Sequence, residues 1–309
     1  MTQAPTRTRA WLMGARPQTL PAAAAPVVVG TAMAAAADRF ALLPAIAALV
    51  GAELIQIGTN FANDYFDAVK GADTDDREGF TRVTQTGLIS PGRVKVASAI
   101  AFGLAFLVGI YLVAVGGLPI VVVGLASILA GITYTGGPYP FGYYGLGDLF
   151  VFVFFGLFAV TGTYYVQAVS DVASGFPLWI PSGTVTLDVI VASLPMAALS
   201  TAILVVNNVR DLETDRATGK ITLAVRLGYR GSRLEFLGLL VLAYLVPGYF
   251  AMTGDGFTAL LPLLSLPYAY RIWTTVSTRT DGEALNPALE STGKLLALYA
   301  VLFAGGILA

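Results

Sequence analysis

The chain of 309 residues contains no cysteine and no histidine. The lack of cysteine excludes disulfides, thiolate metal sites and cysteine nucleophiles, and the lack of histidine excludes Ser-His-Asp triads and histidine general bases. Charged residues are also scarce, at 12%, whereas soluble domains carry about 25%. The formal net charge of −1 does not favour a nucleic-acid-binding protein. Any catalysis therefore depends on the remaining polar side chains or on a bound metal.

Hydrophobic residues make up 56% of the chain and fall into long runs. Because a membrane helix needs about 20 apolar residues, the sequence predicts an all-α membrane protein with a single polytopic domain over residues 1–309 and nine transmembrane helices. The predicted spans are 18–37, 41–63, 95–115, 118–135, 148–170, 187–208, 233–252, 256–275 and 292–309. The first run has no clear cleavage site, so it is interpreted as a span and not as a signal peptide.

The basic residues indicate how these spans are oriented. With nine spans, every lysine and arginine except Arg39 falls on the same side of the membrane as the N-terminus. Lysine and arginine concentrate on the cytoplasmic side of membrane proteins. We therefore expect a multi-pass protein of the cell (inner) membrane, with a cytoplasmic N-terminus and an external C-terminus. The third and fourth spans are separated only by residues 116–119.

Two polar loops on the predicted cytoplasmic side share a spacing. Asn63 precedes Asp67 by four residues at the end of the second span, and Asn207 precedes Asp211 in the same way at the end of the sixth, with Asp215 four residues further on. Residues four apart share one face of a helix. The two loops indicate a pseudo-repeat with halves of about 15–140 and 145–309, and repeat-built membrane proteins often place sites between their repeats.

Clustered carboxylate and amide oxygens suit Mg²⁺, which usually takes one or two carboxylates together with substrate phosphate oxygens. The basic residues interleaved with them suit a phosphate or diphosphate. One acidic loop alone is more often a solvated turn, but two loops with matched spacing favour a site. The predicted metal ligands are Asn63, Asp67, Asn207, Asp211 and Asp215, and the predicted catalytic residues are Asp67, Asp211 and Asp215.

The two acidic motifs and the predicted span pattern resemble the UbiA superfamily of intramembrane aromatic prenyltransferases over nearly the whole chain. The resemblance implies a UbiA-type bundle of nine membrane helices in which the motifs hold Mg²⁺ and a polyprenyl diphosphate. Further stretches resemble the naphthoate branch of the superfamily. These stretches are 16–21, 63–67, 134–140, 145–148, 207–224 and 286–293.

That branch implies 1,4-dihydroxy-2-naphthoate as the acceptor and a role in menaquinone synthesis. The ring would attack the allylic cation at the carbon bearing the carboxylate, and CO₂ and diphosphate would leave to give demethylmenaquinol. Loss of CO₂ replaces loss of a ring proton, which fits a chain without histidine. The first motif departs from the superfamily pattern, because Gly71 stands where a further aspartate is common and Asp73 follows instead.

Nine residues are candidate substrate-binding residues, namely Asp64, Asp73, Arg77, Arg82, Tyr134, Tyr139, Asp148, Arg210 and Lys220. The basic members would bind diphosphate, with cytoplasmic loop charge as the alternative. Tyr134 and Tyr139 could stabilise the cation, although Tyr139, Tyr143 and Tyr144 are also typical of an interfacial aromatic belt. Asp148 would be costly against lipid, which indicates a functional or paired role, or it caps the helix that begins there.

Two other functions compete with this interpretation. Another acceptor is possible within the same superfamily, such as 4-hydroxybenzoate, homogentisate, haem or a glycerol-phosphate lipid. A secondary transporter would also have repeats and buried polar residues, and Glu53 inside the second span is a candidate relay. The predicted acids gather at span ends and not at mid-span, which favours the transferase.

Overall fold

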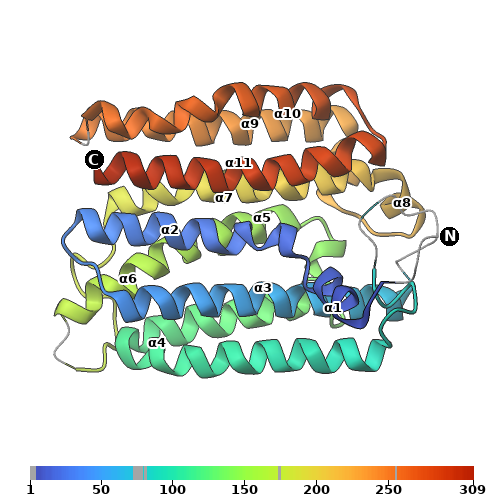
Figure 1. Ribbon diagram of the computed structural model, residues 1–309, viewed down its shortest axis with the longest axis horizontal. Coiled ribbons are helices and arrows are strands. Elements are labelled where there is room, and N and C mark those ends of the chain that lie inside the picture. Colours follow the sequence, from blue (N-terminus) through green and yellow to red (C-terminus); the bar gives the residue numbers. More distant parts are fainter. Residues whose placement is uncertain (1–4, 72–78, 80–81, 173–174, 255) are drawn as a thin grey trace.

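The computed structural model describes residues 5–71, 79, 82–172, 175–254 and 256–309. Within these residues every regular element is a helix, and most of the helices run lengthwise beside one another (Figure 1). The elements are α1 (Arg7–Ala15), η1 (Pro17–Thr19), α2 (Pro21–Ala36), α3 (Leu42–Lys70), α4 (Pro91–Thr133), η2 (Phe141–Tyr143), α5 (Gly147–Val151), η3 (Phe152–Phe158), α6 (Ala159–Val172), α7 (Leu187–Arg210), α8 (Leu212–Ala217), α9 (Leu223–Thr253), η4 (Gly256–Ser265), α10 (Leu266–Thr278) and α11 (Gly282–Leu308). The all-α prediction is confirmed for this part of the chain.

Six of the described helices are long and apolar enough to cross a membrane. A seventh candidate arises if α1 and η1 are taken with α2 as one bent span, whose two parts meet at 46°. The protein is therefore a multi-pass membrane protein. The count of nine spans and the side on which the N-terminus lies stay predictions.

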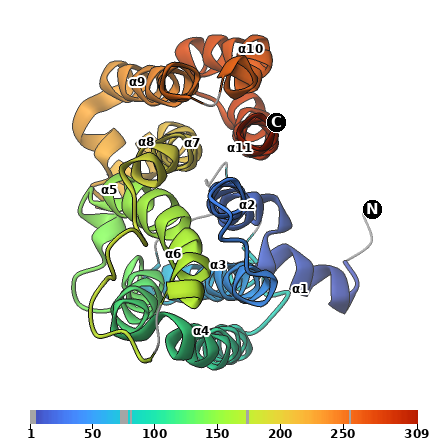
Figure 2. The same ribbon diagram turned by 90° about the vertical axis from the view of Figure 1, so that its left-hand side faces the viewer.

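The helix α4 contains a sharp break. It is 43 residues long, but Gly117 has φ 66° and ψ −154°, which no helical residue adopts. A Cβ at this position would lie 1.9 Å from the carbonyl oxygen of Pro177, so only glycine fits. Figures 1 and 2 show the two arms of α4 side by side. The break falls within residues 116–119, where the sequence predicts the boundary between the third and fourth spans.

The helix α7 forms the centre of the bundle. Of its most apolar window, 72% is buried inside the protein, against 17% for α4. Small residues allow neighbouring helices to approach it closely, as is common where membrane helices pack. A Cβ added at Gly156 of η3 would lie only 2.1 Å from the Cβ of Ala197 in α7. This close packing fixes the end of α7, which carries the second acidic motif.

The two acidic motifs lie at the same end of the bundle. The end of α3, the helix α8 and the start of α11 meet at the right-hand side of Figure 1, opposite the C-terminus. Residues about 150 positions apart in the sequence are thereby brought to one region, as the pseudo-repeat predicts. The division of the chain into two repeat halves is itself an interpretation that the fold does not test.

Candidate active site

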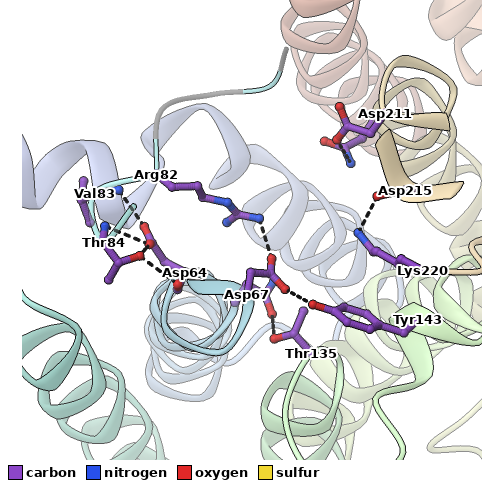
Figure 3. Close-up of polar contacts among 12 residues, drawn as sticks. Asp64, Asp67, Arg82, Val83, Thr84, Thr135, Tyr143, Asp211, Asp215 and Lys220 are labelled. Carbon is purple, nitrogen blue, oxygen red and sulfur yellow. Dashed lines mark hydrogen bonds and ion pairs between the residues drawn. The ribbon is translucent and has the colours of Figure 1, made fainter. Parts of the chain in front are cut away.

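The first acidic motif lies on the last turns of α3, and within it Asp67 is hydrogen-bonded to two separate parts of the chain. Asp67 is buried, and its Oδ2 accepts a hydrogen bond of 2.8 Å from Nη2 of Arg82 while its Oδ1 accepts one of 2.6 Å from the hydroxyl of Tyr143 (Figure 3). One turn earlier, Oδ1 of Asn63 accepts a hydrogen bond of 2.8 Å from the hydroxyl of Thr135. Asn63 and Asp67 thus share the face of α3 directed at the segment between α4 and α5, as their spacing predicts.

Asp64, unlike Asn63 and Asp67, is hydrogen-bonded to the backbone of the segment that follows Arg82. Its carboxylate accepts hydrogen bonds from the backbone N–H groups of Val83 and Thr84, at 3.1 and 3.2 Å, and another from the Thr84 hydroxyl. Its side chain is 1% exposed. Asp64 therefore anchors the backbone directly after Arg82 and helps to present that arginine to Asp67.

The second acidic motif spans the junction of α7 and α8. Asp211 directly follows α7 as its C-terminal cap residue. Helical hydrogen bonding continues across the junction, because the N–H of Asp215 donates to the carbonyl of Asp211 at 2.7 Å. Asn207 Nδ2 lies 3.4 Å from Asp211 Oδ2. Asn207, Asp211 and Asp215 consequently follow one another at successive turns along one side of the chain.

Arg210 organises this second motif. Its guanidinium binds both oxygens of Asp211, each at 2.7 Å, and also donates to the side-chain oxygens of Asn207 and Asn286, each at 2.8 Å. Asn286 comes from the start of α11. A planar arginine fork with several acceptors is a geometrically specific contact, so Arg210 joins α7 to α11 at the site.

Tyr143 and Lys220 lie between the two motifs. Lys220 Nζ is 3.3 Å from Asp215 Oδ1 and 5.5 Å from the ring centre of Tyr143. The hydroxyl of Tyr143 in turn donates to Asp67 of the first motif. Lys70 Nζ also lies 5.1 Å from that ring. The backbone N–H of Ile221 donates to the carbonyl of Tyr143 at 2.9 Å. Figure 3 shows Tyr143 and Lys220 between Asp67 and Asp215, so the two motifs form one site.

An aromatic row leads from this site along α5 and η3. The ring of Tyr134 stands edge-on to Phe141 at 5.7 Å, and Phe141 stacks on Phe150 at 3.8 Å. Phe150 contacts Phe154 at 5.8 Å, and Phe154 contacts Phe158 at 5.2 Å. We call Tyr134, Phe141, Phe150, Phe154 and Phe158 the aromatic row. Its π faces provide electron-rich surface beside the polar site.

Asp148 is buried beside this row. It is 5% exposed, and neither carboxylate oxygen accepts a hydrogen bond from the described residues. The preceding residue, Gly147, packs against the Tyr134 hydroxyl, since a Cβ there would lie 3.0 Å from that oxygen. The residue before α5 is Leu146 and no side chain caps this helix, so the capping role considered for Asp148 is not observed.

Not every sequence candidate lies in the site. Tyr139 is 78% exposed, and its ring contacts Tyr144 at 6.4 Å. Asp73 and Arg77 fall outside the residues that the structure describes. Among those that it does describe, no three acidic side chains converge into a cage for a metal ion. The predicted roles of these residues therefore stay predictions.

The sequence interpretation missed two of the contacts that hold the site together. An interfacial aromatic belt does not account for the hydrogen bond from the Tyr143 hydroxyl to Asp67. No sequence pattern indicates that the Thr135 hydroxyl binds Asn63. Both lie in the Gly- and Pro-rich segment between α4 and α5, where no periodic pattern indicates which side chain turns inward.

Comparison with known proteins defines the class to which this site belongs. The model of the UbiA prenyltransferase family matches residues 23–287, and the chain belongs to that family. The fold agrees, because the structure of a UbiA homolog from Aeropyrum pernix K1 superposes with a TM-score of 0.67 at 15% identity, covering 92% of this chain and 96% of the other. A UbiA homolog from Archaeoglobus fulgidus bound to GPP and Mg²⁺ gives a TM-score of 0.61 at 15% identity, covering 95% and 99%.

Curated relatives place the chain more narrowly. It is 39% identical to the 1,4-dihydroxy-2-naphthoate octaprenyltransferase of Escherichia coli (strain K12), covering 97% of this chain and 96% of that protein. It is 38% identical to the enzyme of the same name from Mycobacterium tuberculosis (strain ATCC 25618 / H37Rv), covering 96% of each. The resemblance to the UbiA superfamily and to its naphthoate branch is confirmed.

Tyr143 offers a test of the connection between the two motifs. Replacing it with phenylalanine removes the donor to the buried Asp67 carboxylate, and a hydrogen bond to a charged group contributes about 1.5–3 kcal/mol. We expect Tyr143→Phe to lower the thermal unfolding midpoint of the protein in detergent. Tyr144→Phe, at a neighbouring ring that is 46% exposed, is the matched control. Equal midpoints for the two variants would contradict the bridging role.

Proposed function

We propose that this chain transfers a polyprenyl group from polyprenyl diphosphate to 1,4-dihydroxy-2-naphthoate, with loss of diphosphate and CO₂, to give demethylmenaquinol. The observation that carries the proposal is that two acidic motifs from distant helices, each paired with basic side chains, face one another across Tyr143 and Lys220. This arrangement suits a diphosphate with bound metal. The acceptor follows from the names of full-length relatives at 34–39% identity.

The residues present fit Mg²⁺. All candidate donors are carboxylate or amide oxygens, and each motif brings one or two carboxylates, which is what Mg²⁺ usually takes beside substrate phosphate oxygens. A site completed by the substrate does not require three converging acids. We infer that Asn63 and Asp67 hold metal on one side of the diphosphate and that Asn207, Asp211 and Asp215 hold it on the other. The metal would stabilise the charge that develops on the leaving diphosphate.

The chain's own cations would bind the diphosphate. Arg82, Arg210 and Lys220 all contact motif carboxylates and are largely buried, so they are positioned where the diphosphate would lie. Asp64 acts through Arg82 by fixing the backbone of the next two residues. Arg77 remains a candidate for binding the diphosphate, and Asp73 remains a candidate for binding the metal or ordering its loop.

The aromatic row and Asp148 would serve the rest of the reaction. The allylic cation needs electron-rich and water-poor surroundings, and the aromatic row begins at Tyr134 and continues away from the polar site. A buried carboxylate with no hydrogen-bond donor is costly, so we infer that Asp148 accepts a hydrogen bond from a hydroxyl of the acceptor. No side chain has to remove a ring proton, because the electrons of the bond to the departing CO₂ restore the aromatic ring.

The acceptor is tested with carboxyl-labelled 1,4-dihydroxy-2-naphthoate. Purified protein, Mg²⁺ and a polyprenyl diphosphate should give a prenylated naphthoquinol without the ¹³C label, together with equal amounts of labelled CO₂ and of diphosphate, measured by mass spectrometry and a diphosphate assay. 4-Hydroxybenzoate, offered in parallel, should not be prenylated. Label retained in the product, or transfer to 4-hydroxybenzoate alone, would refute the acceptor and leave the family assignment intact.

The metal ligands are tested by neutral isosteres. Asp67→Asn and Asp211→Asn should each lower the rate of prenyl transfer by about 10²–10³-fold, the loss typical for one group that stabilises transition-state charge. Excess chelator should abolish transfer in the wild type. The matched control is Glu213→Gln, because Glu213 lies next to the second motif with its side chain 61% exposed. Near-wild-type rates in both aspartate variants would overturn the ligand assignment.

We also propose that the acidic motifs face the cytoplasm and that the protein lies in the cell membrane. A cysteine replacing Trp179, which is 81% exposed in the segment before α7, should react with an impermeant thiol reagent applied to intact cells. The chain has no other cysteine, so all labelling reports on the introduced one. A cysteine at the exposed Ala217 of α8 should react only after lysis. Gly117 is unsuitable for this test, because a side chain there meets Pro177. The reverse labelling pattern would refute the orientation.

A further inference from the structure

The carboxylates assigned to the metal already have cationic partners from this chain. Arg82 Nη2 lies 2.8 Å from Asp67 Oδ2, the fork of Arg210 binds Asp211, and Lys220 Nζ lies 3.3 Å from Asp215 Oδ1. The exposed fractions of the paired side chains range from 1% to 19%. In these three pairs of the described residues, each carboxylate is matched by a cation, and the pairs lie where salt screens charges poorly.

A divalent cation on its own would meet competition at these carboxylates. To bind Asp67 or Asp215 it must either displace the paired basic side chain or share the carboxylate with it, and in both cases like charges at short distance repel strongly away from bulk water. The displaced cation would also lose its partner while buried, which is unfavourable. Mg²⁺ alone should therefore bind weakly.

A diphosphate removes both penalties. Its oxygens accept the displaced arginine and lysine, and they also complete the coordination of the metal that takes over the carboxylates. Metal and diphosphate together add charges of opposite sign, so the pair changes the net charge of the site less than either ligand does by itself.

The three cations are not equally suited to such an exchange. Arg210 is held by the side chains of Asn207, Asp211 and Asn286 at once. Lys220 sits on a flexible stem, retains 19% exposure and has the longest contact of the three. The backbone directly after Arg82 is anchored by Asp64, so an exchange of partner by Arg82 requires no loss of those backbone contacts.

We propose that Arg82 and Lys220 restrain the metal-binding carboxylates and change partner from carboxylate to diphosphate, so that the protein takes up Mg²⁺ and prenyl diphosphate cooperatively, as one complex. The inference rests on the proposed function, because it takes the motif acids as metal ligands and a diphosphate as the anion. Removing a residue that only binds a ligand weakens binding. Removing Arg82 or Lys220 should instead strengthen the binding of Mg²⁺ in the absence of diphosphate.

Binding is measured by isothermal titration calorimetry on the full chain in nanodiscs, with geranyl S-thiolodiphosphate as a slowly reacting probe. In the wild type, the probe should raise the affinity for Mg²⁺, and Mg²⁺ should raise the affinity for the probe by the same factor, within the range of about 5–150-fold typical of coupled sites. Arg82→Gln and Lys220→Gln should each bind Mg²⁺ alone on the order of tenfold more tightly than the wild type. Both should bind the probe more weakly and show a smaller coupling factor.

Two controls separate charge from structure. Arg82→Lys keeps the positive charge and should leave binding of Mg²⁺ alone as weak as in the wild type. Arg216→Gln removes a cation that is 52% exposed on α8 and should change neither affinity. Size-exclusion profiles and melting temperatures report whether each variant is folded, and Lys220→Gln carries the test if Arg82→Gln does not fold.

The outcomes distinguish this inference from the function on which it rests. Unchanged or weaker binding of Mg²⁺ alone in the glutamine variants, or metal and probe affinities that are independent in the wild type, would overturn the exchange while leaving the prenyl diphosphate assignment intact. A wild-type protein that does not bind the probe at any Mg²⁺ concentration would overturn the proposed function as well.

Discussion

The carboxylate of Asp67 is the contact on which the arrangement of the site depends. Through Arg82 it fixes the side chain that follows the first polar loop, and through Tyr143 it reaches the segment between α4 and α5. Because that segment also hydrogen-bonds to Ile221 beyond the second motif, one buried aspartate connects both halves of the site. A buried charge is tolerated only with such partners, so the need to satisfy Asp67 constrains three separate parts of the chain.

The bundle supplies the rigidity that these polar contacts need. The helix α7 is buried over most of its length and approaches its neighbours closely at small residues, as between Gly156 and Ala197. Its last residue, Arg210, is thereby positioned so that its guanidinium reaches Asp211 and Asn286. The close packing of the apolar part of α7 thus supports the polar contacts at its end.

Local sequence patterns predicted those parts of the site that depend on helical spacing. The four-residue interval places Asn63 and Asp67 on one face of α3, and the same interval orders Asn207, Asp211 and Asp215 along the junction of α7 and α8. The break at Gly117 falls where residues 116–119 separate two apolar runs. Patterns of this kind do not predict which distant side chains meet. The bond between Tyr143 and Asp67 joins residues 76 positions apart through a segment without regular periodicity, and the outward position of Tyr139 has no local signal either.

The chain lacks histidine, and the acids of its two motifs are paired with basic side chains; both features suit a reaction that needs no strong base. Asp67, Asp211 and Asp215 each form an ion pair with a basic side chain of this chain. The three motif acids are therefore arranged to hold positive charge. An acceptor that loses CO₂ in place of a ring proton needs no strong base at the carbon under attack. The proposed reaction requires stabilisation of the departing diphosphate anion and shielding of the allylic cation. The charged groups of the two motifs suit the first requirement, and the aromatic row beside them suits the second.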